Sequence, residues 1–343
     1  MINKGWRVWD MDIYLKKAVL HIVDREAGDP VYSQKEMDLT REYTRDYLTK
    51  KIQKLPSTHT KTGVLTEGSV FAKLCQQTKN DFLISSIKIV SRWYDTYKES
   101  EESPSASVFI ALYEEDTQLY LALLKVNFQE GYTNIIENDD GSTNELIIHR
   151  ALLSGKSKKA DEGIIVNLEN LNYEMTEKRY LFSGEKQLYF STKVIESIPD
   201  PSLDENISVI KKVAGKIGAK FENSTHDVIA DIKEAVYDLV EESGQIDAKV
   251  VAQKVFKDNI SAQQSFQEEV VENGYIDQVS VSKEVREIVE KKYAKQKLKL
   301  SNGIELTVPI EVYRNPDLIE FNNNPDGTIS VSIKNVDEVI NQM

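Results

Sequence analysis

The sequence predicts an α+β fold in two parts: an N-terminal antiparallel sheet with helices, then a helical array closed by a C-terminal antiparallel β-hairpin sheet. Two apolar runs at residues 108–113 and 119–128 are typical of central strands covered on both faces. Successive amphipathic segments with brief turns lie between residues 207 and 274. Apolar and polar residues then alternate near the end of the chain, which indicates strands with one buried face.

A stretch with two prolines, residues 197–206, separates the β-rich part from the helical part. We therefore expect an α+β domain over residues 11–200 and a helical domain over residues 201–343, with the terminal sheet at 297–336. A chain of 343 residues fits two domains of ordinary size. Residues 1–10 are interpreted as an N-terminal extension.

The first domain is predicted to begin with a strand followed by helices. Residues 11–24 favour a strand that ends at a cluster of Gly, Asp and Pro. Residues 36–55 predict an amphipathic helix, because apolar side chains recur there at helical spacing, at Leu39, Tyr43, Tyr47, Leu48 and Ile52. Further helices are expected at residues 70–78 and 82–97.

The sheet of the first domain is predicted from four later segments. The runs at residues 108–113 and 119–128 flank a short polar turn, so they predict a hairpin at the centre of the sheet. Residues 145–153 and 162–170 are expected to add further strands. The sheet is therefore predicted to be antiparallel.

Four helical segments are predicted for the second domain: residues 207–221, 224–244, 246–259 and 261–274. Ser224 or Thr225 is available as an N-cap, and Gly244 and Gly274 lie just past predicted helix ends. Short helices joined by brief turns make a compact array, in which a helix-turn-helix is one arrangement.

Two β-hairpins in series are predicted at the C-terminus. Asn302 and Gly303 lie between the strands of the first hairpin, and Asn-Gly suits a type I′ turn because both central residues need positive φ. The second hairpin turns at residues 324–327, after which Ile329, Val331 and Ile333 alternate with polar residues. We expect each hairpin to have one buried and one exposed face.

Composition indicates a soluble cytoplasmic protein. Forty per cent of the residues are apolar and 29 per cent are charged, and the apolar runs are far shorter than the roughly 20 residues of a membrane span. No apolar signal segment occurs near the N-terminus. Cys75 is the only cysteine, so no intrachain disulfide can form. The net charge of −13 argues against indiscriminate coating of DNA, although an acidic protein can still carry a basic face.

No motif of catalysis, metal binding or cofactor binding occurs in the sequence. The four histidines are far apart, and no P-loop, Gly-x-Gly-x-x-Gly or Gly-x-Ser-x-Gly pattern is present. The loop at residues 154–159 is basic, but a solvated loop explains it better than a phosphate site. A nuclease needs clustered carboxylates, often with a lysine nearby, and the candidates are Glu114, Glu115 and Asp116 with Lys125, and Asp326 with Lys334. Acidic turns at a sheet edge are the simpler interpretation.

Two basic segments stand out against the acidic background. The first, at residues 207–221, holds no acid, and its last three lysines share one helix face; its members are Lys211, Lys212, Lys216 and Lys220. The second, at residues 283–299, has seven basic residues against three acidic ones, and its candidate DNA contacts are Lys291, Lys292, Lys295, Lys297 and Lys299. Lysines at a helix C-terminus also favour the macrodipole, which explains Lys291 and Lys292 without DNA.

Several blocks of the sequence resemble the bacterial 37-kDa nucleoid-associated protein family. They are the closing "NPDGTISVSIKNV", the opening "MDIYLKKAVLHIVDREAGDPVYSQKEMDL" at residues 11–39, "LYLALLKVNF" at 119–128 and "KRYLFS" at 178–183. None is a chemical motif, and their order across nearly the whole chain makes the resemblance specific. The resemblance implies a bacterial protein associated with the nucleoid.

Three functions follow as hypotheses. The first is a non-enzymatic protein that binds double-stranded DNA through lysine–phosphate contacts, with little base readout and no cofactor. The second is an interaction module that docks on a DNA-processing protein through its acidic surface. The third is a metal-dependent nuclease with a dispersed site. A homo-oligomer is expected under the first two, through the terminal sheet edge or the helices, and no membrane partner is expected.

Overall fold

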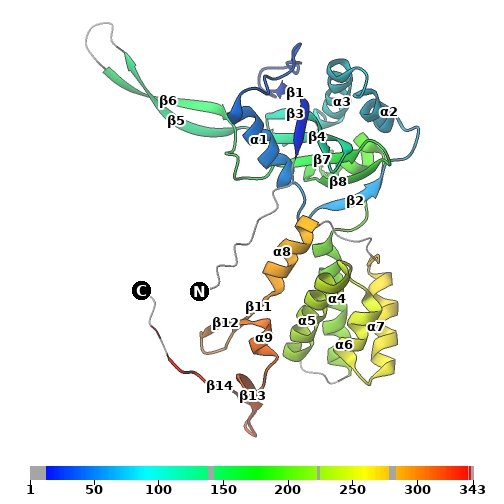
Figure 1. Cartoon of the computed structure of the whole chain (residues 1–343), viewed down its shortest axis with the longest axis vertical. Coiled ribbons are helices and arrows are strands. Elements are labelled where there is room, and N and C mark those ends of the chain that lie inside the picture. The colour runs from blue at the N-terminus through cyan, green and yellow to red at the C-terminus, as the bar shows by residue number, and fades with distance from the viewer. Residues whose placement is uncertain (1–12, 138–142, 222–224, 278–282, 339, 341–343) are drawn as a thin grey trace. The chain divides into compact units, whose positions relative to one another are not determined.

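The computed structural model describes residues 13–137, 143–221, 225–277, 283–338 and 340. The chain divides into two compact units, Met1–Ser202 and Leu203–Met343 (Figure 1). The predicted extension at residues 1–10 lies outside the described residues. Each unit has its own apolar core, and each is described here by itself.

The first unit is built on a six-stranded antiparallel sheet with the strand order β1-β3-β4-β7-β8-β2. Its strands are β1 (Tyr14–Val23), β2 (Lys61–Val64), β3 (Ala106–Glu115), β4 (Gln118–Asn127), β7 (Glu162–Asn167) and β8 (Asn172–Thr176). The predicted strands in β1, β3, β4 and β7 are confirmed, whereas β2 and β8 were not predicted. Both are short, with four and five residues; β2 forms one edge of the sheet, and β8 lies between β2 and β7.

The central hairpin β3–β4 is covered on both faces, as predicted. Alternate residues of these strands enter two different cores: Val108, Ile110 and Leu112 pack with helices α2 (Val70–Gln77) and α3 (Phe82–Tyr97). Phe109, Ala111 and Tyr113 instead pack with Leu48 and Ile52 of helix α1 (Glu42–Gln53). The period of two along a strand therefore places α1 on one face of the sheet and α2 and α3 on the other.

Helix α1 begins six residues later than the prediction of residues 36–55. Asp38 accepts hydrogen bonds from the Thr40 amide at 3.0 Å and the Thr40 hydroxyl at 2.6 Å. The Met37 amide donates to the Ala18 carbonyl of β1 at 2.7 Å. These bonds hold the segment in a turn along the sheet, because a short polar side chain competes with the helix for backbone donors.

A two-stranded ribbon, here called the arm, extends from the sheet of the first unit (Figure 1). It consists of β5 (Gln129–Glu137) and β6 (Thr143–Leu152), which pair with each other in a sheet of their own. β6 was predicted, but β5 was not, because its apolar and polar residues follow no regular alternation. The unit closes with the small hairpin β9 (Arg179–Phe182) and β10 (Glu185–Leu188) and the π-helix η1 (Phe190–Ile195).

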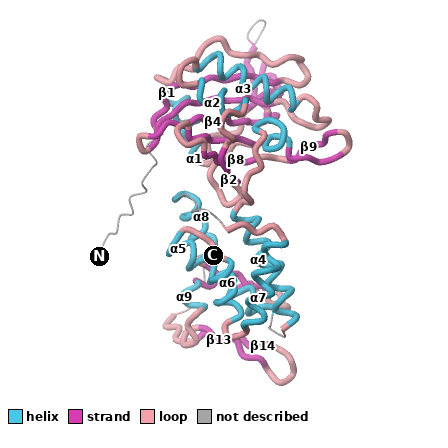
Figure 2. The backbone as a smooth tube through the Cα atoms, turned by 90° about the vertical axis from the view of Figure 1, so that its right-hand side faces the viewer, coloured by secondary structure: helices cyan, strands magenta, loops and turns pink. Residues whose placement is uncertain are grey.

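The described residues of the second unit form five helices before the terminal hairpins (Figure 2). They are α4 (Leu203–Lys220), α5 (Thr225–Ser243), α6 (Ala248–Phe256), α7 (Ile260–Glu272) and α8 (Lys283–Tyr293). Asp247 and Asn259 cap α6 and α7, and Gly244 and Gly274 have φ of +68° and +87° just beyond α5 and α7. The four predicted helices are thus confirmed, while the proposed N-cap Ser224 lies outside the described residues.

The chain ends in two separate hairpins, not in one continuous sheet. The first pairs β11 (Lys295–Lys299) with β12 (Glu305–Pro309), and the second pairs β13 (Ile319–Asn323) with β14 (Ile329–Ile333). A short helix, α9 (Ile310–Tyr313), connects them.

The predicted type I′ turn at Asn302 and Gly303 is wrong, because only Gly303 has positive φ there. The Leu300 amide donates to the Ile304 carbonyl, and the Gly303 amide donates to the Leu300 carbonyl, so the connection is a longer loop. The expected buried face is confirmed only in part in the last hairpin, because Ile319 is buried whereas Ile329 and Ile333 of β14, on the same face, are exposed. In the sequence Ile329 and Ile333 alternate like a buried face, but no core covers them within the described residues.

Candidate nucleic-acid interface

The outward face of β11 carries three lysines in a row. Strand alternation exposes Lys295, Lys297 and Lys299, while Gln296 between them is buried and Leu298 is half-buried. Residues two apart in a strand are about 6.6 Å apart, so the three lysines span about 13 Å. This span covers roughly four phosphates of one DNA strand along the helix axis.

The partner strand leaves this lysine face largely free of acids. On β12, Thr307 lies opposite Lys297 and Pro309 lies opposite Lys295, whereas Glu305 lies opposite Lys299. The Lys299 Nζ and a Glu305 carboxylate oxygen are 3.4 Å apart, but both side chains are at least 70% exposed. An exposed pair of this kind contributes only about 0–1 kcal/mol, so a phosphate can replace Glu305 at little cost.

The end of α8 brings the two predicted basic segments together around Tyr293. Lys211 of α4 lies over the buried Tyr293 ring, with its Nζ 5.6 Å from the ring centroid. Lys292 lies 5.7 Å from the same centroid and forms an ion pair with Asp204 at 2.8 Å. Burial lowers the pKa of Lys211, and repulsion from Lys233 and Lys292 lowers it further. Lys211 is therefore partly a packing residue.

The remaining lysines of α4 lie along its outer face. Lys212, Lys216 and Lys220 are exposed and recur every four residues, as the sequence predicts. Lys216 pairs with Glu269 of α7 at 2.7 Å, and the Lys220 Nζ is 5.7 Å from the Phe221 ring centroid. This face is consequently a second basic surface, and Lys291 adds another exposed cation at the end of α8.

One lysine of this region was missed in the sequence. Lys233 of α5 donates to the buried Gln296 side chain of β11 at 3.0 Å, and burial lowers its pKa. Lys233 lies among the acids of an otherwise acidic helix face, so no local charge excess marks it. The contact fixes the inward face of β11 against α5, which keeps the lysine face turned outward.

Part of the acidic face of α5 is neutralised within the chain. Arg314, just after α9, pairs with Glu234 at 3.0 Å and with Asp238 at 2.7 Å. Asp238 also pairs with Lys254 of α6, and these cations lower its pKa against the effect of burial. A surface that already holds its own cations is a weak site for docking a basic partner.

The candidates for nuclease chemistry do not converge in the first unit. Lys125 is fully buried and donates to Glu162 at 2.8 Å and to the Tyr180 hydroxyl at 2.7 Å. Burial lowers the pKa of Lys125, and the Glu162 carboxylate opposes this shift. Glu114 pairs with Lys16 at 2.6 Å. The described residues contain no group of three or more His, Cys, Asp or Glu side chains placed to hold a metal ion.

The basic loop at residues 154–159 is organised around a lysine. Lys51 donates to the Ser154 hydroxyl at 2.6 Å, to the Lys158 carbonyl at 2.8 Å and to the Gly155 carbonyl at 3.3 Å. A phosphate site needs backbone amides that point toward the ligand, whereas this loop turns its carbonyls toward a cation. This arrangement therefore favours a solvated loop over a phosphate-binding site as the interpretation of residues 154–159.

These features define a two-unit α+β protein whose second unit carries exposed lysine faces. Within the described residues, no helix is long and apolar enough to cross a bilayer. The family model NA37, described as nucleoid-associated protein YejK, matches residues 19–341. The chain therefore belongs to this family of nucleoid-associated proteins, which confirms the resemblance found in the sequence. A comparison with curated proteins finds no match.

Proposed function

We propose that this protein binds double-stranded DNA through lysine–phosphate contacts with little sequence specificity, and that it does so without catalysis. The observation that carries the proposal is the outward face of β11, with Lys295, Lys297 and Lys299 in a row. Membership in a nucleoid-associated family supports it. Membership also suggests a non-enzymatic role.

The chemistry of the face favours phosphates over base edges. Lysine acts as a compact point charge, whereas base-edge recognition more often uses Arg, Asn or Gln. Lys291 and Lys292 extend the face toward α8, and the outer lysines of α4 provide a second contact surface: Lys212, Lys216 and Lys220. Lys211 supports the end of α8 through its contact with the Tyr293 ring.

The direct experiment is fluorescence anisotropy of a labelled duplex with the intact protein and two variants. The variant Lys295→Glu/Lys297→Glu/Lys299→Glu should weaken binding by about a hundredfold at moderate salt, because three phosphate contacts become repulsions. The control Lys35→Glu/Lys73→Glu/Lys88→Glu makes the same change in net charge at exposed lysines of the first unit. It should bind within about threefold of the intact protein. Equal losses in both variants would reject a local interface.

The second candidate is recruitment to the nucleoid by docking on a DNA-processing protein. The net charge of −13 favours it, because long-range repulsion from DNA does not oppose contact with a protein. Under this function the intact protein would show no duplex binding even at low salt, and its partner would remain associated after nuclease treatment. Self-association is proposed under either function.

A further inference from the structure

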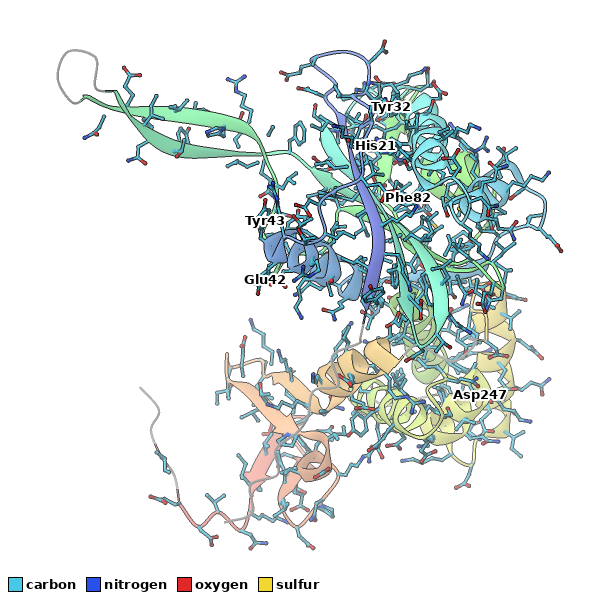
Figure 3. The ribbon with its side chains drawn as sticks, turned by 45° about the horizontal axis from the view of Figure 1, so that its top comes forward. His21, Tyr32, Glu42, Tyr43, Phe82 and Asp247 are labelled. Carbon is cyan, nitrogen blue, oxygen red and sulfur yellow. The ribbon has the colours of Figure 1, made fainter. Side chains whose placement is uncertain are left out.

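The arm of the first unit exposes large apolar side chains that nothing in the described structure covers. Tyr132 is 67% exposed, Leu146 is 73% exposed and Ile148 is 45% exposed. Tyr132 lies directly opposite Ile148, and Leu146 lies two residues further along β6, so the three share one face of the ribbon. Figure 3 shows the side chains of the arm standing away from the body of the first unit.

The arm also lacks the support that a ribbon normally needs. Among the described strands, β5 and β6 pair only with each other, which leaves both outer edges open. A two-stranded ribbon is marginally stable in water, and open edges invite pairing with another chain. Covering the arm with a further protein surface would bury its apolar face and support the isolated ribbon.

The charge of the arm disfavours DNA as the molecule that packs on its apolar face. Residues 129–152 contain five acids and a single arginine, Arg150. A ribbon that enters a DNA groove needs Lys or Arg to offset the phosphates. The occupant is therefore a protein.

The distribution of charge along the arm fits a second copy of the same chain. Glu145 lies toward the distal end of the arm. At the proximal end Arg150 is offset by Glu130 at 3.7 Å and Lys156 pairs with Asp46 at 2.9 Å, and the exposed Lys158 and Lys159 follow in the next loop. The arm is about 30 Å long, because each strand residue adds about 3.4 Å. When two such arms lie antiparallel about a twofold axis, the acidic end of each meets the basic end of the other.

The apolar area is sufficient for such a dimer. At their observed exposures the three side chains leave roughly 370 Å² accessible per copy, taking about 200 Å² for a fully exposed large side chain. Two copies would bury about 740 Å² of apolar surface, and apolar atoms make up about 60% of an interface. The total of about 1,200 Å² reaches the lower range of specific interfaces.

We propose that the arm is a dimerisation element, in which the face formed by Tyr132, Leu146 and Ile148 packs against the same face of a second copy. This site differs from the terminal sheet edge and the helices, where the sequence led us to expect self-association. The proposal does not depend on DNA binding, because it concerns the first unit alone.

Sedimentation velocity of the intact protein at about 50 μM, without DNA, tests the proposal. The intact protein should sediment as a dimer, and Leu146→Glu/Ile148→Glu should sediment as a monomer. The control Val64→Glu/Ile260→Glu places the same two charges at other exposed apolar sites, 60% and 76% exposed, and should remain a dimer. A monomeric intact protein, or a dimer that survives Leu146→Glu/Ile148→Glu, would overturn the proposal.

Disulfide trapping locates the contact independently of stability. Ile148 lies near the middle of β6, close to the expected twofold axis, and the native Cys75 is buried. Oxidised Ile148→Cys should give a covalent dimer on a non-reducing gel, while Val64→Cys should stay a monomer. Equal cross-linking of both variants, or of neither, would contradict the arm-to-arm contact.

Discussion

Lys125 and Lys297 both lie within antiparallel hairpins, yet their surroundings give them opposite roles. Lys125 of β4 is fully buried and is held by Glu162 and two tyrosines, Tyr97 and Tyr180. Lys297 of β11 is exposed opposite Thr307. The difference arises because helices cover both faces of the first sheet, whereas the terminal hairpin is covered on one face only. A buried lysine serves the fold, and an exposed row of lysines remains available to a ligand.

The largest expected effect follows from breaking the buried pair. Lys125→Met should destabilise the first unit by about 3–5 kcal/mol, because it leaves the Glu162 carboxylate buried without its cation. Denaturant unfolding followed by circular dichroism measures the change. Lys125→Met/Glu162→Leu removes both charges and should recover part of the loss. A loss below about 1 kcal/mol for the single variant would mean that water or another cation reaches the site.

The first unit should also lose stability in mild acid through His21. Figure 3 labels His21 on β1, where Nδ1 accepts from the Ser33 amide and Nε2 contacts the Ser86 hydroxyl at 3.2 Å. Burial lowers the pKa of His21 from 6.5 to about 4.

Because the unfolded histidine binds a proton more readily, its contribution is fully present above about pH 6.5 and declines as the pH falls toward 4. The loss is on the order of 3 kcal/mol. Stability measured from pH 7 to pH 4 should fall less steeply in His21→Gln than in the intact protein. An unchanged slope would remove His21 as the cause.

The two basic faces of the second unit, on β11 and on α4, should contribute unequally to duplex affinity. Lys212→Glu/Lys220→Glu should weaken duplex binding about tenfold, less than the change at β11, because each exposed cation supplies one phosphate contact. Lys211 is left intact in this variant because its contact with Tyr293 supports the fold. Competition binding at fixed salt compares the two variants. A larger loss from the α4 variant would make α4 the principal contact.

The smallest effect is expected at Tyr293. Tyr293→Leu removes the ring beneath Lys211 and Lys292, and each cation–π contact contributes roughly 0.5–1 kcal/mol. The second unit should therefore unfold at slightly lower denaturant, with DNA affinity reduced about twofold or less. A large loss of affinity without loss of stability would indicate that Tyr293 itself contacts DNA.

The sequence predicted helices and strands well where apolar residues recur with a single period along the segment. The helices α2 and α3 and the strands β3 and β4 follow from apolar spacing alone, and Gly244 and Gly274 mark helix ends. β5 carries no such period, because both faces of the arm are exposed. The type I′ geometry expected at Asn302 and Gly303 occurs instead at Asp116 and Thr117. These two residues join Glu115 of β3 to Gln118 of β4, and so short a connection requires positive φ at both of them, although neither is glycine.

The candidate site was predicted in part. Alternation along β11 exposes its lysines as a strand pattern implies, and α4 has its predicted lysine face. The meeting of Lys211 and Lys292 at Tyr293 depends on how α4 and α8 pack, which no local pattern encodes. The burial of Lys125 likewise depends on Glu162, 37 residues away.

The salt dependence of duplex binding tests the central claim most directly. The slope of log affinity against log salt counts phosphate contacts, at about −0.9 per contact. The slope for Lys295→Glu/Lys297→Glu/Lys299→Glu should be shallower than that of the intact protein by about 2.7, which corresponds to three lost contacts. The matched control in the first unit should keep the full slope. Equal slopes in the intact protein and the β11 variant would show that these lysines do not meet DNA.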